Sequence, residues 1–174
     1  MEENKLGQKT DLHTHLNAVL PSEKMKELAE KLLGKEELPV DTRNKLEQAL
    51  QKPLELISET NSWNTLQTIN GNRKTIRDIL IDYGYGNNFI RTIAEEYKKH
   101  GIKYVELTTD MKMLQAIREK KVDIKSIEED YGITFRFLLG FNKNSLDTKS
   151  FTDKSVQKEF KDNPYLIGLD IMRN

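Results

Sequence analysis

The 174-residue chain carries 28 basic and 28 acidic side chains and no cysteine. This charge balance supplies no overall field for nucleic acid or a membrane surface, so we expect neither as a partner and a small or medium-sized ligand instead. The absence of cysteine excludes disulfides and thiolate metal ligands. No signal-peptide core is recognisable at the N-terminus and no apolar run approaches the ~18 residues of a membrane span, so we expect a cytoplasmic protein.

Four short runs rich in β-branched and aromatic residues predict strands, and amphipathic segments between them predict helices. The predicted strands cover residues 10–16, 102–108, 133–141 and 165–171. Strands separated by helices indicate β-α-β crossovers and a parallel sheet. Because no Pro/Gly-rich linker interrupts the chain, residues 1–174 are treated as part of a single domain.

The clearest helix signals lie at the ends of the amphipathic segments. Ser22 is the predicted N-cap of a helix that Gly34 ends, and a second helix stops at Gly101. A third helical segment, residues 111–127, is predicted to break near Val122. His100, one of three histidines, precedes Gly101 at a helix C-terminus, and we assign it a capping role because basic side chains interact favourably with that end.

The segment of residues 10–16 contains the other two histidines, His13 and His15, one residue apart. Alternation along a strand would place Asp11 on their face and Leu12 on the opposite, helix-covered face. The histidine Cα atoms would then lie roughly 6.5–7 Å apart, so the imidazoles could converge on one ion at about 2.0–2.1 Å. His13 and His15 are therefore predicted metal ligands. Two hydrogen-bonded histidines at a strand end are the alternative.

The stretch DLHTHLNAVLP, residues 11–21, resembles the first-strand signature of the adenosine deaminase family of metal-dependent amidohydrolases. Residues 93–107 resemble the helix and second strand of that family, and residues 166–171 resemble its fourth strand. Residues 63–69 are similar to the apolar helix that covers the family's site. The likeness runs along nearly the whole chain in the family's order.

The resemblance implies an α/β fold, the (β/α)8 TIM barrel of the metal-dependent hydrolase type, of which this chain supplies roughly the first four β/α units. It implies one divalent ion, expected to be Zn2+, which His13 and His15 help to hold and which activates water. The implied reaction is hydrolytic deamination of an adenine nucleoside or nucleotide. The residues expected to contact the substrate are Asn17, Trp63, Leu66, Asp170 and Arg173.

The family's remaining ligands and its acid–base groups come from strands five to eight, whereas this sequence predicts four strands and a barrel takes ~250 residues. We therefore expect the catalytic residues beyond Asn174, in the same or another chain, and expect the 174 residues alone to be inactive. Four strands would leave two open edges and an inner face that we expect to be apolar. We expect the missing half of the barrel to cover these edges and this face, and a homo-oligomer is a further possibility.

Within the matching region several residues depart from the family pattern. Asn17 and Ala18 stand where the family usually has aspartate and glycine, and Thr108 stands where it usually has arginine. These differences leave open which purine is bound. Glu106 and Asp170 should both point into the barrel; we interpret Glu106 as structural, and Asp170 as either structural or part of the site.

Two other functions fit the same sequence. A polymerase-and-histidinol-phosphatase type metallo-phosphoesterase also opens with an Asp-Leu-His-x-His strand, but it requires further histidines on later strands. A non-catalytic or degenerate half-barrel assembly subunit would keep the fold without the chemistry. Metal content and the presence of a C-terminal half discriminate among these possibilities.

Overall fold

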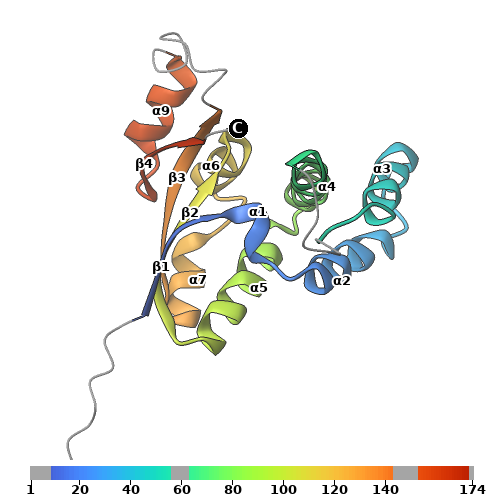
Figure 1. The fold of residues 1–174 in the computed structure, drawn as a ribbon, viewed down its shortest axis with the longest axis horizontal. Helices are drawn as coiled ribbons and strands as arrows, with labels where there is room; N and C mark the ends of the chain where they lie inside the picture. The colour runs from blue at the N-terminus through green and yellow to red at the C-terminus, as the bar shows by residue number, and fades with distance from the viewer. Residues whose placement is uncertain (1–8, 56–62, 143–152, 173–174) are drawn as a thin grey trace, which may run out of the picture.

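The computed structural model describes residues 9–55, 63–142 and 153–172 and contains a four-stranded parallel sheet, with most of the helices on one side of it (Figure 1). The strands are β1 (Lys9–His15), β2 (Ile102–Thr109), β3 (Thr134–Asn142) and β4 (Leu166–Met172). They lie side by side in the order in which they occur along the chain, and every pairing is parallel. All four predicted strands are confirmed, with ends that differ by one residue at most.

The helices lie in the three crossovers. The first holds α1 (Leu16–Val19), α2 (Ser22–Leu33), α3 (Val40–Leu50), α4 (Trp63–Asp82) and α5 (Gly86–Lys99). The second holds α6 (Met111–Arg118) and α7 (Ile124–Tyr131), and the third holds α9 (Lys154–Asp162). Helices α5, α6 and α7 lie next to the sheet, whereas α2, α3 and α4 form a group farther from it (Figure 1).

Helix α5 shows why these segments are helical. Its large buried side chains recur at helical spacing on the face toward the sheet; they are Phe89, Ile90, Ile93, Ala94 and Tyr97. The helix ends at Lys99, and Gly101 follows with a φ of 71°, a conformation that glycine adopts without a steric penalty. His100 is exposed at the C-cap, where the sequence places it.

The predicted break within residues 111–127 is confirmed, because the segment forms two short helices. Each begins at an aspartate whose carboxylate accepts a backbone hydrogen bond, Asp110 from Met113 and Asp123 from Ser126. Two separate caps explain why the segment does not continue as one helix.

The predicted N-cap of α2 is wrong by one residue. Ser22 is the first residue of the helix, and Pro21 occupies the capping position. The Ser22 hydroxyl is buried and donates a hydrogen bond to the carboxylate of Glu55, so it does not cap the helix. A contact with a distant residue has replaced the local one.

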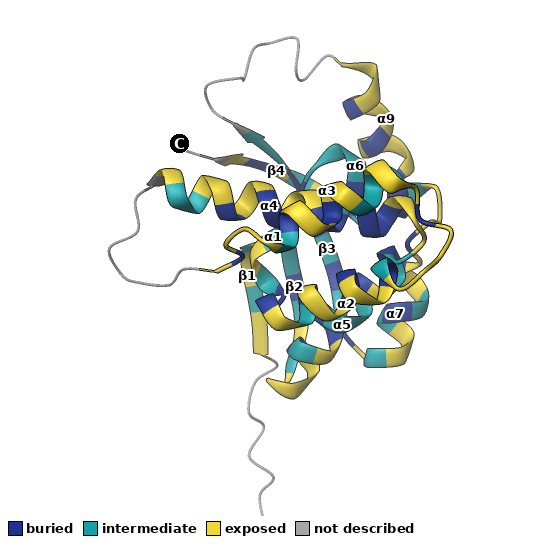
Figure 2. Ribbon diagram, turned by 90° about the vertical axis from the view of Figure 1, so that its right-hand side faces the viewer, coloured by how far each residue is buried: buried dark blue, intermediate teal, exposed yellow. Residues whose placement is uncertain are grey.

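Much of the core lies between the sheet and the helices next to it, α5, α6 and α7 (Figure 2). Alternation along β2 and β3 turns one set of side chains toward the helices, and these are fully or almost fully buried: Val105, Leu107, Phe135, Phe137 and Leu139. Paired residues in the two strands confirm that these positions share a face, since Val105 lies opposite Phe135 and Leu107 opposite Phe137.

The other face of the sheet, called the inner face below, is not the apolar surface that the sequence predicts. Its strands carry mainly polar side chains there: Thr10, His13, His15, Tyr104, Glu106, Thr108, Arg136 and Asp170, with Leu12 and Leu138 as aliphatic members. The prediction is wrong because alternation sends most aliphatic residues of β2 and β3 under the helices. The exposed aliphatic residues Leu169 and Ile171 of β4 alternate with Asp170 and pair with Leu139 and Phe141, so they lie on the helix side.

Four β/α units in chain order match the arrangement expected for the first part of a barrel. Within the described residues, β1 and β4 form the two edges of an open sheet, so a closed barrel is not observed. No helix in this described part of the chain is long and apolar enough to cross a membrane.

Candidate functional site

The two histidines predicted as metal ligands lie together at the C-terminal end of β1. Their ring centroids are 6.4 Å apart, and the rings are nearly perpendicular, with an interplanar angle of 89°. Both side chains are exposed on the inner face, and His13 is 58% exposed. The C-terminal ends of parallel strands are where barrel enzymes carry their active sites, so the pair stands where that architecture requires it.

The predicted position of Asp11 on the same face as the histidines is wrong. Its carboxylate accepts hydrogen bonds from Tyr97 of α5, at 2.7 Å, and from Thr14, at 2.8 Å. Asp11 therefore faces the helices, while Leu12 is 58% exposed on the inner face. Burial and the hydrogen bond to Asp11 raise the pKa of the Tyr97 hydroxyl, which keeps it a donor at neutral pH.

Asp170 of β4 joins the histidines across the width of the sheet. Its carboxylate is 6% exposed; Oδ1 lies 3.2 Å from Nε2 of His13, and Oδ2 accepts a hydrogen bond from Thr108 of β2 at 2.8 Å. Strands β1 and β4 thus bring His13, His15 and Asp170 together, and Thr108 of β2 holds the carboxylate.

The two imidazoles lie on one open face, and imidazole nitrogen is one of the usual ligands of zinc. The described residues contain no group of three or more His, Asp or Glu side chains placed to hold a metal ion by themselves. Any further ligands must therefore come from outside the described residues or from solvent.

Asn17 lies two residues after His15, at the start of the first βα connection, and is held by a buried arginine. The Nη1 of Arg77 in α4 donates to the side-chain oxygen of Asn17 at 2.8 Å. A guanidinium group can only donate, so the oxygen of the amide must face it, and the Asn17 NH2 group points elsewhere. Among the described residues, no acceptor contacts that NH2 group.

Arg77 also connects the ends of β1 and β2. It is 1% exposed and contacts the carboxylates of Asp78, at 2.6 Å, and Asp110, at 2.5 Å. Lys74 contacts the same two carboxylates. Burial alone would raise the pKa of Asp110, but Arg77 and Lys74 outweigh it and hold the pKa below its usual value.

A cavity of about 170 Å³ opens between His15 and this charged cluster. It is lined by His15, Asn17, Lys74, Arg77, Thr108, Thr109, Asp110 and Gly140. The buried hydroxyl of Thr109 has no hydrogen-bond partner in the described part of the protein. An unused hydroxyl and an unused amide NH2 therefore border the same cavity beside His15.

Sequence reasoning missed Arg77, Thr109 and the cavity they border. The available signal for Arg77 was weak: it lies close to the apolar residues Ile76 and Leu80 of the same helix and one turn after another arginine, Arg73. An arginine at such a position indicates a buried partner, but the sequence alone does not identify Asn17 or Asp110 as that partner.

The remaining predicted site residues are placed as follows. Leu66 is half-buried in the first turn of α4, and the contacts of the described residues do not join it to the histidines. The side chain of Trp63 and all of Arg173 lie outside the described residues. Glu106 accepts a hydrogen bond from Tyr104 at 2.8 Å, which agrees with a structural role.

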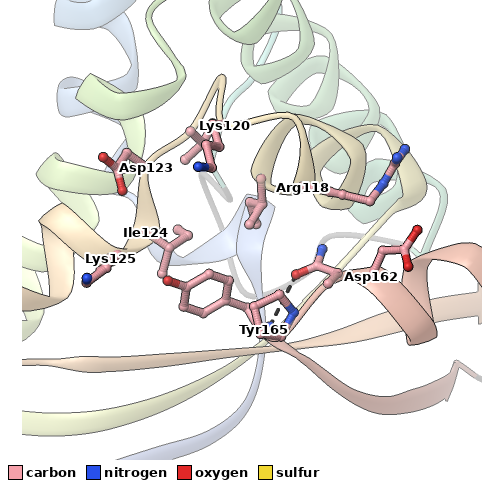
Figure 3. Close-up of a pocket in the computed structure, with 11 residues that line it drawn as sticks. Arg118, Lys120, Asp123, Ile124, Lys125, Asp162 and Tyr165 are labelled. Carbon is pink, nitrogen blue, oxygen red and sulfur yellow. Dashed lines mark hydrogen bonds between the residues drawn. The ribbon is translucent and has the colours of Figure 1, made fainter.

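A second cavity, of about 380 Å³, lies among α6, α7 and α9, beside the start of β4 (Figure 3). It is bordered by the connection between α6 and α7 and by Tyr165, the residue before β4. Arg118 and Asp162 come from separate helices at its rim (Figure 3). It shares no lining residue with the cavity beside His15, so it is separate from the histidine site.

Comparisons with known proteins now test the resemblance. No protein-family model and no curated protein matches the sequence. The structure is similar to Arabidopsis ADAL complexed with IMP, with a TM-score of 0.61, 19% identity, and 96% of this chain and 50% of that chain covered. It is similar to adenine deaminase from Arthrobacter aurescens, with a TM-score of 0.54, 16% identity, and coverage of 94% and 48%.

A third similar structure is an amidohydrolase from Burkholderia ambifaria with bound Zn, with a TM-score of 0.55, 13% identity, and coverage of 96% and 44%. The chain thus spans about half the length of these proteins. Because the similar structures are deaminases and amidohydrolases of the adenosine deaminase family, the predicted resemblance is confirmed at the level of the fold: this chain has the fold of the N-terminal part of their barrels.

Proposed function

We propose that this chain supplies the N-terminal, metal-binding half of a deaminase-like hydrolase barrel that acts on an adenine nucleoside or nucleotide. The observation that carries the proposal is the pair of His13 and His15, whose ring centroids lie 6.4 Å apart on the inner face at the end of β1, in a sheet whose fold is similar to that of an adenine deaminase. In this assignment the two imidazoles hold one divalent ion, taken to be Zn2+. Such an ion lowers the pKa of a bound water toward 7.

The chemistry requires water to add at C6 of the purine and the amino group to leave as ammonia. Within this chain, Asp170 stands beside His13 and can hold that imidazole in place. General acid–base groups are expected beyond Asn174, in the same or another chain, and they are commonly worth about 10²–10⁴ in rate.

The cavity beside His15 is the proposed contact region for the substrate. The NH2 group of Asn17 and the hydroxyl of Thr109 both offer a donor to an oxygen-rich group such as a sugar. Lys74 and Arg77 are balanced by Asp78 and Asp110, so this cavity presents no surplus positive charge. A nucleotide phosphate would need a cation from elsewhere, for which Arg173 is the proposed residue; Trp63, Leu66 and Asp170 remain proposed substrate contacts.

The activity test uses the protein in its assembled form, as a longer polypeptide or with its partner chain. Release of the amine is measured as ammonia with adenosine, AMP and adenine and as methylamine with N6-methyl-AMP, for the wild type, His13→Ala/His15→Ala and His100→Ala. We expect release with at least one substrate, its loss in the double variant, and no change in His100→Ala, whose exposed side chain lies at the other end of the sheet. The 174-residue chain alone should show no release, even with added zinc.

A non-catalytic assembly subunit is the competing function, and one observation favours it. The described residues contribute two histidine ligands and no third ligand placed with them. Metal-loaded assembled protein that releases neither ammonia nor methylamine from any of the four compounds would support this second function and contradict the first.

A further inference from the structure

Strand β1 contains one extra residue between Asp11 and Thr14, at the position of the first histidine. Asp11 pairs with Val105 and Thr14 pairs with Leu107, so a step of three residues on β1 matches a step of two residues on β2. Between them, His13 has a φ of 70°, in the left-handed region that residues other than glycine seldom occupy. The strand therefore carries a β-bulge at the metal site, a feature that redirects side chains.

The bulge decides which way the histidines point. In an uninterrupted strand, Asp11, His13 and His15 would share one face. Because Asp11 contacts Tyr97 of α5, that face is the helix-covered one, and both imidazoles would be buried against the helices. The extra residue reverses the alternation after Asp11, so both histidines lie on the inner face.

A set of hydrogen bonds spans the bulge on its helix side. Thr14 Oγ1 donates to Asp11 Oδ1 at 2.8 Å, and the Tyr97 hydroxyl donates to Asp11 Oδ2 at 2.7 Å. One carboxylate thus joins the residue before the bulge to the residue after it and fastens both to α5. Tyr97 is only 6% exposed, so its hydroxyl is held in place by the surrounding core.

We infer that this Tyr97–Asp11–Thr14 brace holds His13 in its left-handed conformation and thereby sets the separation and direction of the two imidazoles that bind the metal. The inference rests on the proposed function for the role of the metal, but the effect of the brace on backbone geometry does not. Tyr97, Asp11 and Thr14 are positioning residues, because they act on the ligands through the backbone. A left-handed histidine costs free energy relative to an extended one, so the brace must compensate for it.

The test compares three variants that delete single parts of the brace with a matched control. Tyr97→Phe removes one hydroxyl and keeps the buried ring, Thr14→Val removes the other donor, and Asp11→Asn removes the charge. The control is Tyr131→Phe, which deletes the same hydroxyl from a pairing with Glu95 on the surface. All are prepared in the assembled protein, with this chain labelled at its histidines.

The first measurement is NMR of the three histidines of the metal-free protein. We expect the resonances of His13 and His15 to shift and broaden in each brace variant, while His100 serves as an internal reference and does not move. The control variant should leave all three unchanged. A change in thermal stability with unchanged His13 and His15 resonances would mean that the brace is merely structural and would overturn the inference.

The second measurement is the dissociation constant for Zn2+, compared with the His13→Ala/His15→Ala protein. We expect Tyr97→Phe and Thr14→Val to weaken binding by about tenfold or more, as loss of groups that orient metal ligands usually does. Unchanged affinity would contradict the inference. If the wild type binds no Zn2+, the proposed function fails, whereas the metal-free NMR result still decides whether the brace positions the histidines.

Discussion

His13 and His15 each offer one neutral nitrogen donor, and the metal prediction depends on both. We expect the assembled protein to contain one divalent ion per chain and the double variant His13→Ala/His15→Ala to contain none, because no thiolate or clustered carboxylate among the described residues can replace them. Elemental analysis after dialysis measures the content. His100→Ala is the control, and equal metal content in the double variant would show that the ion, if present, binds elsewhere.

Asp110 provides a prediction about pH. Its pKa is lowered in the folded protein, so it stabilises the fold fully above its ordinary value of 3.8 and loses that effect as the pH falls through the lower folded value. Asp110→Asn keeps an oxygen that can cap α6 but removes the charge beside Arg77. We expect it to lower the free energy of unfolding by about 1–3 kcal/mol at neutral pH.

The measurement for Asp110→Asn is denaturant unfolding from pH 7 to pH 2. The difference from wild type should be constant at neutral pH and shrink below pH 3.8. Asp130→Asn, which removes the partner of Arg91 on the surface, is the control and should cost less than about 1 kcal/mol at any pH. If the difference in the free energy of unfolding between wild type and Asp110→Asn does not depend on pH, Arg77 and Lys74 do not lower the pKa of Asp110.

At the scale of secondary structure, α4 is fastened to the first βα connection by two arginines one turn apart. Arg73 is 5% exposed and donates to three backbone carbonyl groups, those of Asn17, Leu20 and Leu54. Arg77 holds the Asn17 side chain. The segment that follows the histidines is therefore positioned by a helix from the outer group.

Arg73→Leu tests this attachment. The leucine fills part of the volume but leaves three carbonyl groups without their donor, so we expect a loss of roughly 3 kcal/mol in the free energy of unfolding. Arg43→Leu is the control, since Arg43 is less buried and donates to two carbonyl groups, those of Leu33 and Lys35. Chemical denaturation of both variants measures the loss in the free energy of unfolding. Equal losses would show that burial of Arg73 adds nothing to the attachment.

These elements also show how far the sequence can be interpreted. The strands and α5 were predictable because their apolar residues recur at periods that one segment alone reveals. The bulge in β1 was not, because DLHTHL alternates regularly and only the pairing with β2 exposes the extra residue. The prediction for Asp11 failed for that reason, and Arg77 was missed because its partners lie on distant segments.

For the whole molecule, the open sheet predicts a partner. Leu169 and Ile171 of β4 are 36% and 55% exposed on the helix side, and Ile167 of β4 and Phe160 of α9 are 46% and 41% exposed. We expect the protein to be found with the remaining strands of the barrel, in a longer polypeptide or in a second chain, and third as a homo-oligomer. A stable, monodisperse 20.3 kDa monomer would contradict the barrel interpretation.

Native mass spectrometry of protein from its own source, together with light scattering, measures this state. Leu169→Lys should weaken the association, because it places a charge on the surface to be covered. Val40→Lys is the control, since Val40 is also exposed, at 71%, but lies at the start of α3, away from the sheet edge. Equal association of both variants would locate the contact elsewhere.

The unequal crossovers have a consequence for the order of folding. Strands β2, β3 and β4 are joined by one or two described helices each, whereas β1 is separated from β2 by five. Closing a longer loop costs more chain entropy, and contacts between distant residues form late. Pairing of β1 should therefore follow the association of the other three strands. A nascent or partly unfolded chain would then hold an ordered sheet of three strands before β1 places His13 and His15 on it. Metal binding would therefore be a late event, and it would report that the native topology is complete.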